Sequence, residues 1–421
     1  MKSAPHLKHD HDSGEGLLSV EEAREKVLSQ IEPLQPLELP LTEAYGCVLA
    51  QDVVAERDLP EFASSAMDGF AVRSSEVADA TTSSPVELRV VGRALIGQRP
   101  EGTVGGGEAM RIATGAPVPA GADTVVPIED CDVAGDVVRI LAGTPQGKHI
   151  RRAGEDAKTG DSLVHAGRRL QAPELALLAT AGVSHPLVRP RPRVVVLSTG
   201  DELIPPSHTP EFGQIRDSNA YTLFGAIREA GAVPMLAGIV RDDVDALKDV
   251  VLSHLAQADA LVSSGGVSVG ERDVVKAAFF RRGELDFFRV AMQPGMPQGF
   301  GHIEGKPYFG LPGNPVSVFV SFEVFIRPAL MKMMGRRNLY RPEISARLAD
   351  DVSGPRGKTQ FARVRVRRTR EGWEATPTGG RGSNLIATVS RANGLAVVPP
   401  GVETATAGSD VRVMLFRSME D

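Results

Sequence analysis

Apolar and polar positions change in regular blocks along residues 191–333, and this pattern predicts a parallel sheet covered by helices. Continuous apolar runs, as in "RVVVLSTG" (193–200) and "DALVSSGG" (259–266), are typical of strands that are buried on both faces. Amphipathic stretches with helical spacing lie between them, as in "SNAYTLFGAIREAG" (218–231). We therefore expect a doubly wound three-layer α/β/α domain with a mainly parallel sheet, whose ligands bind beyond the carboxyl ends of its strands.

The rest of the chain follows other patterns. A helical stretch begins at Ser19, and Glu22 follows at the spacing of a capping box. Short β-type runs separated by Gly and Pro come next, and runs of period two return near the end of the chain. The chain is accordingly predicted to be an α/β multidomain protein with a disordered tail (1–16), a discontinuous N-terminal α+β linker domain (17–55 and 146–189), an inserted small β domain (56–145), the α/β/α domain (190–335) and a C-terminal β-barrel domain (336–421).

Composition excludes several classes of protein. The chain has 421 residues and a net charge of -6, whereas a nucleic-acid-binding surface needs an excess of basic residues. Its two cysteines, Cys47 and Cys131, predict no disulfide framework and favour a reducing cytoplasm. No apolar run reaches the roughly 20 residues of a membrane span, and the start of the chain lacks the apolar core of a signal peptide. We expect neither nucleic acid nor a membrane as a partner.

Three histidines, His6, His9 and His11, stand in the predicted tail. They fit either a metal-binding tail or a solvated, disordered leader. The second interpretation is favoured because no cysteine or later ligand joins the cluster.

The loop "SSGGVSVGERDVVK" follows a predicted strand and carries glycines that would let backbone N–H groups converge on an anion. These glycines are Gly265, Gly266 and Gly270. The helix that follows adds the positive end of its dipole. Asp273 would hold Mg²⁺ against a bound phosphate, and Lys276 lies one turn further on. The alternative is a tight strand-to-helix turn in which Asp273 is a favourable charge at the helix start.

Two more loops at predicted strand ends are acidic. "STGDELIPP" carries Asp201 and Glu202, and "IVRDDVDAL" carries Asp242 and Asp243 where a helix begins. Carboxylates gathered at one edge of a sheet would repel one another unless a cation joins them. Oxygen ligands without a nearby Cys or His set favour Mg²⁺. Ordinary helix capping is the alternative role for Asp242 and Asp243.

The remaining motifs are less specific. "GLPGNPVS" places Asn314 at a helix N-cap and Pro315 at the first helical position. Outside the α/β/α domain, "SSAMDGFAV", "RIATGAPVP" and "IRRAGEDAKTGDSL" contain Asp68, Thr114 and Asp156. Taken singly, each of these three stretches is more simply interpreted as a turn.

Together, six stretches resemble in order the motifs of the MoeA family of molybdopterin molybdenumtransferases, which includes the gephyrin E domain. They are "SAMDGFAV", "RIATGAPVP", "GEDAKTGD", "STGDEL", "SSGGVSVGERD" and "GLPGNPVS", within a match from about residue 17 to the end. The resemblance implies a cytoplasmic enzyme that inserts molybdenum from molybdate into adenylylated molybdopterin, with Mg²⁺-dependent release of AMP. It also implies a molybdopterin-binding domain similar to the MoaB and Mog proteins, a homodimer with its active site between subunits, and a transient contact with molybdopterin adenylyltransferase.

The resemblance also assigns site residues by position. Those that match family residues implicated in activity are Asp68, Thr114, Asp156, Glu202, Asp242 and Asp273, of which the implied metal ligands are Asp242, Asp273 and Glu202. Those implied to bind the pterin, its phosphates or molybdate are Gly265, Gly266, Ser268, Gly270, Lys276, Arg289, Pro312, Gly313, Asn314, Pro315 and Ser383. Arg363 matches a further C-terminal position. Molybdate would lie at the start of the last helix, with Arg289 as its counter-charge, and no covalent intermediate is expected.

One motif departs from the family pattern. Many members read K-P-G-K-P where this chain has "QPGMP" (293–297), so Gln293 and Met296 remove two positive charges. Arg289 and Lys276 remain basic. The change predicts weaker oxyanion binding, or a paralogue with altered metal preference or reduced activity.

Two other functions compete with this interpretation. Molybdopterin adenylyltransferase shares the α/β/α domain but is a stand-alone domain, whereas this chain carries three further regions. A non-catalytic scaffold is the other, because the gephyrin E domain also binds a receptor peptide. The acidic loop residues are all present and no fused adenylyltransferase domain is found, and both features favour catalysis.

Overall fold

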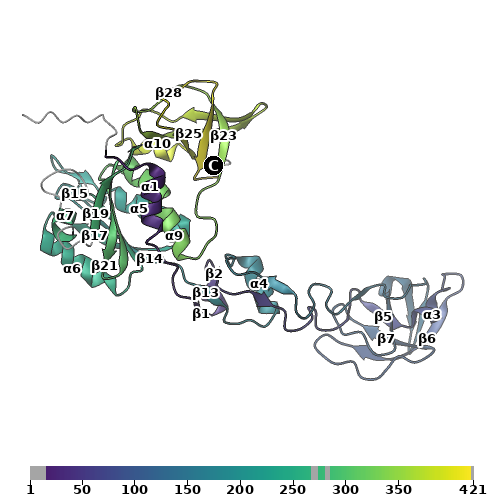
Figure 1. Cartoon of the computed structure of the whole chain (residues 1–421). Coiled ribbons are helices and arrows are strands. Elements are labelled where there is room, and N and C mark those ends of the chain that lie inside the picture. Colours follow the sequence, from purple (N-terminus) through teal and green to yellow (C-terminus); the bar gives the residue numbers. More distant parts are fainter. Residues whose placement is uncertain (1–15, 267–273, 280–284, 419–421) are drawn as a thin grey trace, which may run out of the picture. The chain divides into compact units, whose positions relative to one another are not determined.

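The computed structural model describes residues 16–266, 274–279 and 285–418, and the chain forms two compact units (Figure 1). Unit 1 comprises Met1–Leu37, Gly46–Ala50 and Leu187–Asp421, and unit 2 comprises Glu38–Tyr45 and Gln51–Pro186. Within the described ranges, no helix is both long enough and apolar enough to span a membrane.

Unit 1 contains a six-stranded sheet in the order β17-β14-β18-β22-β21-β19. The first four are parallel neighbours, namely β17 (Val233–Val240), β14 (Arg193–Thr199), β18 (Ala260–Ser264) and β22 (Lys306–Leu311). Two antiparallel strands, β21 (Pro297–Ile303) and β19 (Leu285–Arg289), complete one edge. The register pairs Ser198 with Ser264 and Ser264 with Leu311, so three neighbouring strands end at one level. The predicted, mainly parallel sheet is confirmed.

Helices cover both faces of this sheet (Figure 1). One face carries α1 (Val20–Leu28), α5 (Asn219–Ala230), α8 (Pro315–Ser321) and α9 (Arg327–Met333), and the other carries α6 (Val244–Leu255) and α7 (Val274–Phe279). Side chains of β14 alternate between the two layers, since Val194 and Val196 belong to the first core and Val195 and Leu197 to the second. Burial on both faces explains why the strand is apolar at successive positions.

One helix follows the sequence pattern and another departs from it. Helix α1 has the predicted Ser19–Glu22 capping box and ends at Leu28. The last helix is divided into α8 and α9 by a π-helical segment, η3 (Phe322–Ile326). This segment carries Glu323, which is buried and accepts two hydrogen bonds of 2.9 Å from Arg341. A buried carboxylate requires such a partner.

The C-terminal part of unit 1 is a closed barrel. Its strands follow the order β25-β26-β23-β29-β27, and β27 pairs back with β25. They are β23 (Glu343–Leu348), β25 (Thr359–Thr369), β26 (Gly372–Pro377), β27 (Gly394–Val398) and β29 (Asp410–Leu415). The predicted barrel is confirmed. A short strand, β20 (Met292–Gln293), joins its edge by pairing Met292 with Thr359 and Gln293 with Gln360.

Unit 2 has a separate six-stranded sheet in the order β8-β5-β7-β6-β10-β9. Its strands are β5 (Gly69–Val72), β6 (Val86–Ala94), β7 (Glu108–Ile112), β8 (Thr124–Pro127), β9 (Cys131–Ala134) and β10 (Val137–Ile140). Phe70, Val126 and Val138 lie in its apolar core. Helix α4 (Ala172–Thr180) begins with a second capping box, formed by Gln171 and Glu174.

Candidate functional site

The loops that follow the four parallel strands meet at one edge of the unit 1 sheet. The N–H of Gly200, after β14, donates to the carbonyl of Val240 at 3.3 Å, and the N–H of Gly265, after β18, donates to the carbonyl of Leu311 at 3.0 Å. These bonds join the ends of β14 and β17 and those of β18 and β22. The four loops singled out from the sequence are therefore neighbours in pairs, as the carboxyl ends of parallel strands should be.

The acidic loops contact each other directly. The backbone N–H of Asp242 donates to Oδ1 of Asp201 at 3.3 Å. Partial burial raises the pKa of Asp242, and the nearby charges of Asp201 and Glu202 raise it further. Three carboxylates thus lie in one region, and the charges of Asp201 and Glu202 disfavour ionisation of Asp242.

Asp242 and its neighbour Asp243 have different roles. The Asp243 carboxylate accepts a hydrogen bond of 2.7 Å from the N–H of Ala246, so it is the N-cap of α6. The alternative interpretation, ordinary helix capping, therefore holds for Asp243. The Asp242 side chain makes no such cap and remains with the other acids.

Gly265 and Gly266 have left-handed backbone conformations, with φ of 90° and 73°. A Cβ atom on Gly265 would lie 2.7 Å from the carbonyl oxygen of Thr199, and one on Gly266 would lie 2.5 Å from Cγ2 of Val275. Only glycine fits at both positions. The close approach brings bare backbone against the end of β14, where the Thr199 hydroxyl is buried and has no hydrogen-bond partner among the described residues. This buried hydroxyl can therefore donate to a ligand bound beside the two glycines.

The loop at the start of α8 is fixed from the neighbouring helix. Nδ2 of Asn219, in α5, donates to the carbonyl of Gly313 at 2.7 Å, and Oδ1 of Asn219 is buried without a partner in the described part of the chain. Pro315 occupies the first helical position as predicted. Asn314 occupies the predicted N-cap position, although its side chain makes no capping hydrogen bond. Pro312 beside it is buried.

Part of the predicted phosphate loop lies outside the described residues. This applies to Ser268, Gly270 and Asp273. Lys276 is described, and its ammonium group lies 5.3 Å from the centroid of the Phe287 ring.

A cavity of about 570 Å³ lies where the 293–297 loop meets the barrel. Gln293 and Met296 line it from the loop, Ser317 from the first turn of α8, and Ser383 from the barrel. The carbonyl of Ser383 accepts a hydrogen bond of 3.0 Å from the N–H of Val316, which fixes the barrel loop against the helix start. Two basic residues that sequence analysis did not select complete the lining, and these are Lys358 and Arg381.

Two predicted basic residues lie close to this cavity. Arg289 donates to Sδ of Met296 at 3.4 Å. Arg363 is buried, and its guanidinium donates to the Thr388 hydroxyl at 3.1 Å and to the carbonyls of Gly380 and Gly382. Burial lowers the pKa of Arg363. Its Nη1 has no partner within the described ranges, so this cation supports the 380–382 loop without a carboxylate to neutralise it.

The three unit 2 residues are partly brought together. The N–H of Thr114 donates to Oδ1 of Asp68 at 2.8 Å, so these two motifs form one turn structure. Both side chains remain at least partly exposed. Asp156 lines a separate hollow with Asp161 and Ser162 and is exposed.

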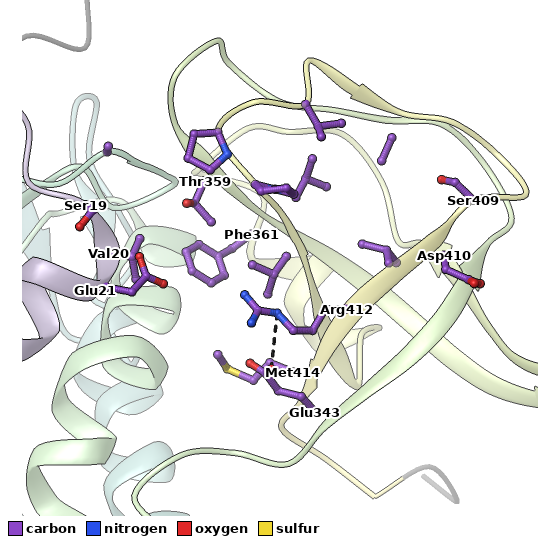
Figure 2. A pocket seen from close by; sticks show the side chains of 18 of the residues that line it. Ser19, Val20, Glu21, Glu343, Thr359, Phe361, Ser409, Asp410, Arg412 and Met414 are labelled. Carbon is purple, nitrogen blue, oxygen red and sulfur yellow. Dashed lines mark ion pairs between the residues drawn. The ribbon is translucent and has the colours of Figure 1, made fainter.

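Two further cavities have different surroundings. One of about 690 Å³ adjoins the acidic loops and is lined by Gly200, Asp201 and Arg241 together with residues of α5 and β17. The other, of about 610 Å³, lies between the start of α1 and the barrel (Figure 2). It is lined by apolar groups such as Phe361 and by an ion pair of 3.4 Å between Arg412 and Glu343, and it contains none of the predicted site residues.

Comparison with known proteins identifies the family. The chain matches three family models, namely MoeA N-terminal region (domain I and II) over residues 18–182, probable molybdopterin binding domain over 195–332, and MoeA C-terminal region (domain IV) over 345–416. The chain belongs to the MoeA family. The family resemblance inferred from the six sequence motifs is thereby confirmed.

Relatives within the MoeA family align over nearly the whole chain. Molybdopterin molybdenumtransferase 2 of Mycobacterium tuberculosis is 42% identical over 401 residues, which cover 94% of this chain and 98% of that protein. Molybdopterin molybdenumtransferase 1 of the same organism is 36% identical over 417 residues, covering 94% and 98%. The crystal structure of the molybdopterin biosynthesis MoeA protein from Pyrococcus horikosii matches with a TM-score of 0.80 and 33% identity, covering 96% of this chain and all of that one.

The acidic loops of this MoeA chain carry carboxylate oxygens of the kind that bind hard cations. Within the described ranges, no three acidic, histidine or cysteine side chains converge closely enough to hold a metal ion. Asp242 and Glu202 are near each other, as predicted, and Asp201 joins them. The sequence signal for Asp201 was its place beside Glu202, whereas nothing in the sequence marked Thr199 or Asn219, whose unpaired atoms appear only in the fold.

Proposed function

We propose that this protein inserts molybdenum from molybdate into adenylylated molybdopterin and releases AMP. The observation that carries the proposal is the meeting of glycine backbone, unpaired hydroxyl and carboxylates at the strand ends of a molybdopterin-binding domain. Relatives that align over 94% of the chain are named molybdopterin molybdenumtransferases. Membership of this family and the acidic strand-end loops together support an enzyme rather than a scaffold.

The proposed phosphate site is the end of β18. Gly265 and Gly266 keep their surroundings free of Cβ atoms, so phosphate oxygens can approach the backbone. The Thr199 hydroxyl lies beside both glycines, has no partner among the described residues and can donate a hydrogen bond to a phosphate oxygen. Ser268 and Gly270 belong to the same proposed loop, and Lys276 follows it on α7.

The proposed metal ligands are Asp242, Glu202 and Asp273. Mg²⁺ held there would neutralise charge on the bridging phosphates. The two described carboxylates suit this ion because they are oxygen donors that repel each other without it. Asp201 orients the Asp242 backbone through its hydrogen bond and so fixes the loop that carries the ligand.

The proposed molybdate site is the cavity at the 293–297 loop. Ser317 and Ser383 offer hydroxyl donors there, and Ser317 belongs to the first turn of α8, which begins at Pro315. Pro312, Gly313 and Asn314 form the loop that leads into this turn. Arg289 reaches the loop through Met296.

The family resemblance supports a wider set of proposals. The protein would work in the cytoplasm as a homodimer, with the active site between subunits and a transient contact with molybdopterin adenylyltransferase. Asp68, Thr114 and Asp156 would serve the site completed by a second subunit. The hydrogen bond between the Thr114 N–H and Asp68 supports a joint role for these two.

Reconstitution tests the proposal. Purified full-length protein is incubated with adenylylated molybdopterin, Mg²⁺ and molybdate, and AMP is quantified together with molybdenum in the pterin product. We expect AMP release that requires both ions, and near-complete loss in Asp273→Asn with the oligomeric state unchanged. Near-normal AMP release by that variant would remove Asp273 from the mechanism. Adenylylation of molybdopterin from ATP would instead identify an adenylyltransferase.

A further inference from the structure

In the cavity proposed for molybdate, the positive charge in the lining does not come from the 293–297 loop. The loop residues that line it, Gln293 and Met296, are neutral, and Met296 has no N–H or O–H to donate. Ser317 and Ser383 are also neutral. A tetrahedral dianion removed from water needs positive charge as well as hydrogen bonds, because an unpaired buried charge is costly. Arg289 contacts Met296 but is not among the described residues that line the cavity, so charge within the lining must come from other residues.

The barrel supplies two cations at this place. The pairing of β20 with β25 sets Met292 opposite Thr359 and Gln293 opposite Gln360, which brings Lys358, the residue before β25, next to the 293–297 loop. Arg381 enters the same cavity from the loop that carries Ser383. Among the described residues that line the cavity there is no aspartate or glutamate. Neither cation forms an ion pair with a carboxylate in the part of the chain that the structure describes.

The loop that carries Arg381 is held firmly. Buried Arg363 donates to the carbonyls of Gly380 and Gly382, on either side of Arg381, and Val316 donates to the carbonyl of Ser383. Because three of the four successive residues from 380 to 383 are tied down through their carbonyls, the base of the Arg381 side chain is fixed at the cavity rim. A preorganised cation loses less conformational entropy when it binds an anion.

We propose that Lys358 and Arg381 bind the oxyanion in this cavity and replace the two loop cations that Gln293 and Met296 do not provide. The inference rests on the proposed function and assigns the charge of its molybdate site to the barrel. Two cations match the two negative charges of molybdate. Arg363 acts through the loop and is a positioning residue.

Direct binding of molybdate tests the inference without any turnover. Full-length protein is dialysed to equilibrium against molybdate and bound molybdenum is quantified, for the unchanged chain, Lys358→Gln, Arg381→Gln and the double variant. Each single variant should bind about tenfold more weakly and the double variant about a hundredfold or more, since charge-assisted hydrogen bonds are about twice as strong as neutral ones. The matched control is Arg356→Gln, which removes an exposed cation two residues from Lys358 that pairs with Glu403 at 3.3 Å. It should bind like the unchanged chain.

A rescue experiment tests whether the double variant loses molybdate binding through the loss of positive charge or through a change in the shape of the cavity. Gln293→Lys and Met296→Lys are added to the double variant, which returns two cations to the cavity from the 293–297 loop. Recovery of molybdate binding to within about tenfold of the unchanged chain supports charge replacement, and no recovery contradicts it. Thermal unfolding of each variant confirms that the barrel is intact.

The outcomes also separate the inference from the proposed function. Undiminished binding by the double variant would overturn the role of Lys358 and Arg381 while leaving the enzyme proposal in place. No molybdate binding by the unchanged chain would overturn the assignment of this cavity, and the inference with it.

Discussion

The backbone N–H of Asp242 donates a hydrogen bond of 3.3 Å to the Asp201 carboxylate, and this bond ties the loop after β17 to the loop after β14. It holds the Asp242 side chain near two other carboxylates. Partial burial and the charges of Asp201 and Glu202 raise the pKa of Asp242. This arrangement disfavours ionisation of Asp242, and the proposed Mg²⁺ would relieve that repulsion.

Removing the Asp242 charge should stabilise the protein in the absence of divalent ions. A raised pKa means that the folded state binds this proton more tightly than the unfolded state, so ionisation lowers stability as the pH rises through the folded pKa. We expect Asp242→Asn to increase the free energy of unfolding by about 0.5 kcal/mol at pH 7, a small value because the side chain is largely solvent-exposed. The gain should shrink towards about pH 4, near the ordinary pKa of aspartate. Urea unfolding in the presence of a chelator measures the stability difference at pH 7 and at pH 4. A variant less stable than the unchanged protein at pH 7 would contradict the prediction.

Gly265→Ala should damage the strand-end loop. The new Cβ would lie 2.7 Å from the Thr199 carbonyl oxygen, at a φ of 90°. We expect a loss of about 2–4 kcal/mol in unfolding free energy, because a steric clash adds to the cost of the left-handed backbone. Gly408→Ala is the matched control, since its φ is 81° and its Cβ would meet nothing within 4 Å. Equal losses in both variants would mean that the contact with Thr199 is not tight.

The buried ion pair at the π-helical segment should be sensitive to removal of one partner. Glu323 is bound by Arg341, and Arg327 lies close enough for its pKa to respond to both charges. Burial lowers the pKa of Arg327 to about 10, and Glu323 opposes this change. Glu323→Ala should therefore cost about 3–5 kcal/mol in chemical denaturation. The double variant Glu323→Leu with Arg341→Met should recover much of that loss, and a double variant as unstable as the single one would contradict this account.

Glu174 in unit 2 should stabilise the protein in a pH-dependent way. Burial alone would raise the pKa of Glu174, but hydrogen bonds from Arg168 and from the backbone N–H of Gln171 outweigh it and the pKa is lowered. A lowered pKa means stability that is present above the ordinary pKa of glutamate and is lost as the pH falls through the folded value. Glu174→Gln should cost about 1 kcal/mol at pH 7 and less near pH 4. A cost that does not change between these two pH values would exclude the charge as its cause.

The sequence predicted the parts of this fold that depend on local patterns. Continuous apolar runs identified β14 and β18, and the Ser19–Glu22 spacing identified the start of α1. The break in the last helix was missed because the stretch around Glu323 has an uninterrupted helical pattern, and the carboxylate is turned inward only by its partnership with Arg341.

The candidate site was predictable to a similar extent. Glycines and acids at strand ends could be found because parallel strands must end together. Lys358 and Arg381 could not, since Lys358 reaches the 293–297 loop through the pairing of β20 with β25 and Arg381 through the loop that carries Ser383, both far from it in the chain. Likewise only the fold reveals that Asp243 caps α6 while the backbone of Asp242 is bonded to Asp201.

Magnesium-dependent binding of AMP tests the central claim most directly. AMP binding is measured by calorimetric titration with and without Mg²⁺ for the unchanged protein, Asp242→Asn and Asp243→Asn. Asp243→Asn is the control, because it removes the same charge one residue away and keeps a side chain that can cap α6. The account predicts that Mg²⁺ tightens AMP binding by about tenfold or more in the unchanged protein and in Asp243→Asn, and not in Asp242→Asn. The same response to Mg²⁺ in all three proteins, or none in the unchanged one, would contradict it.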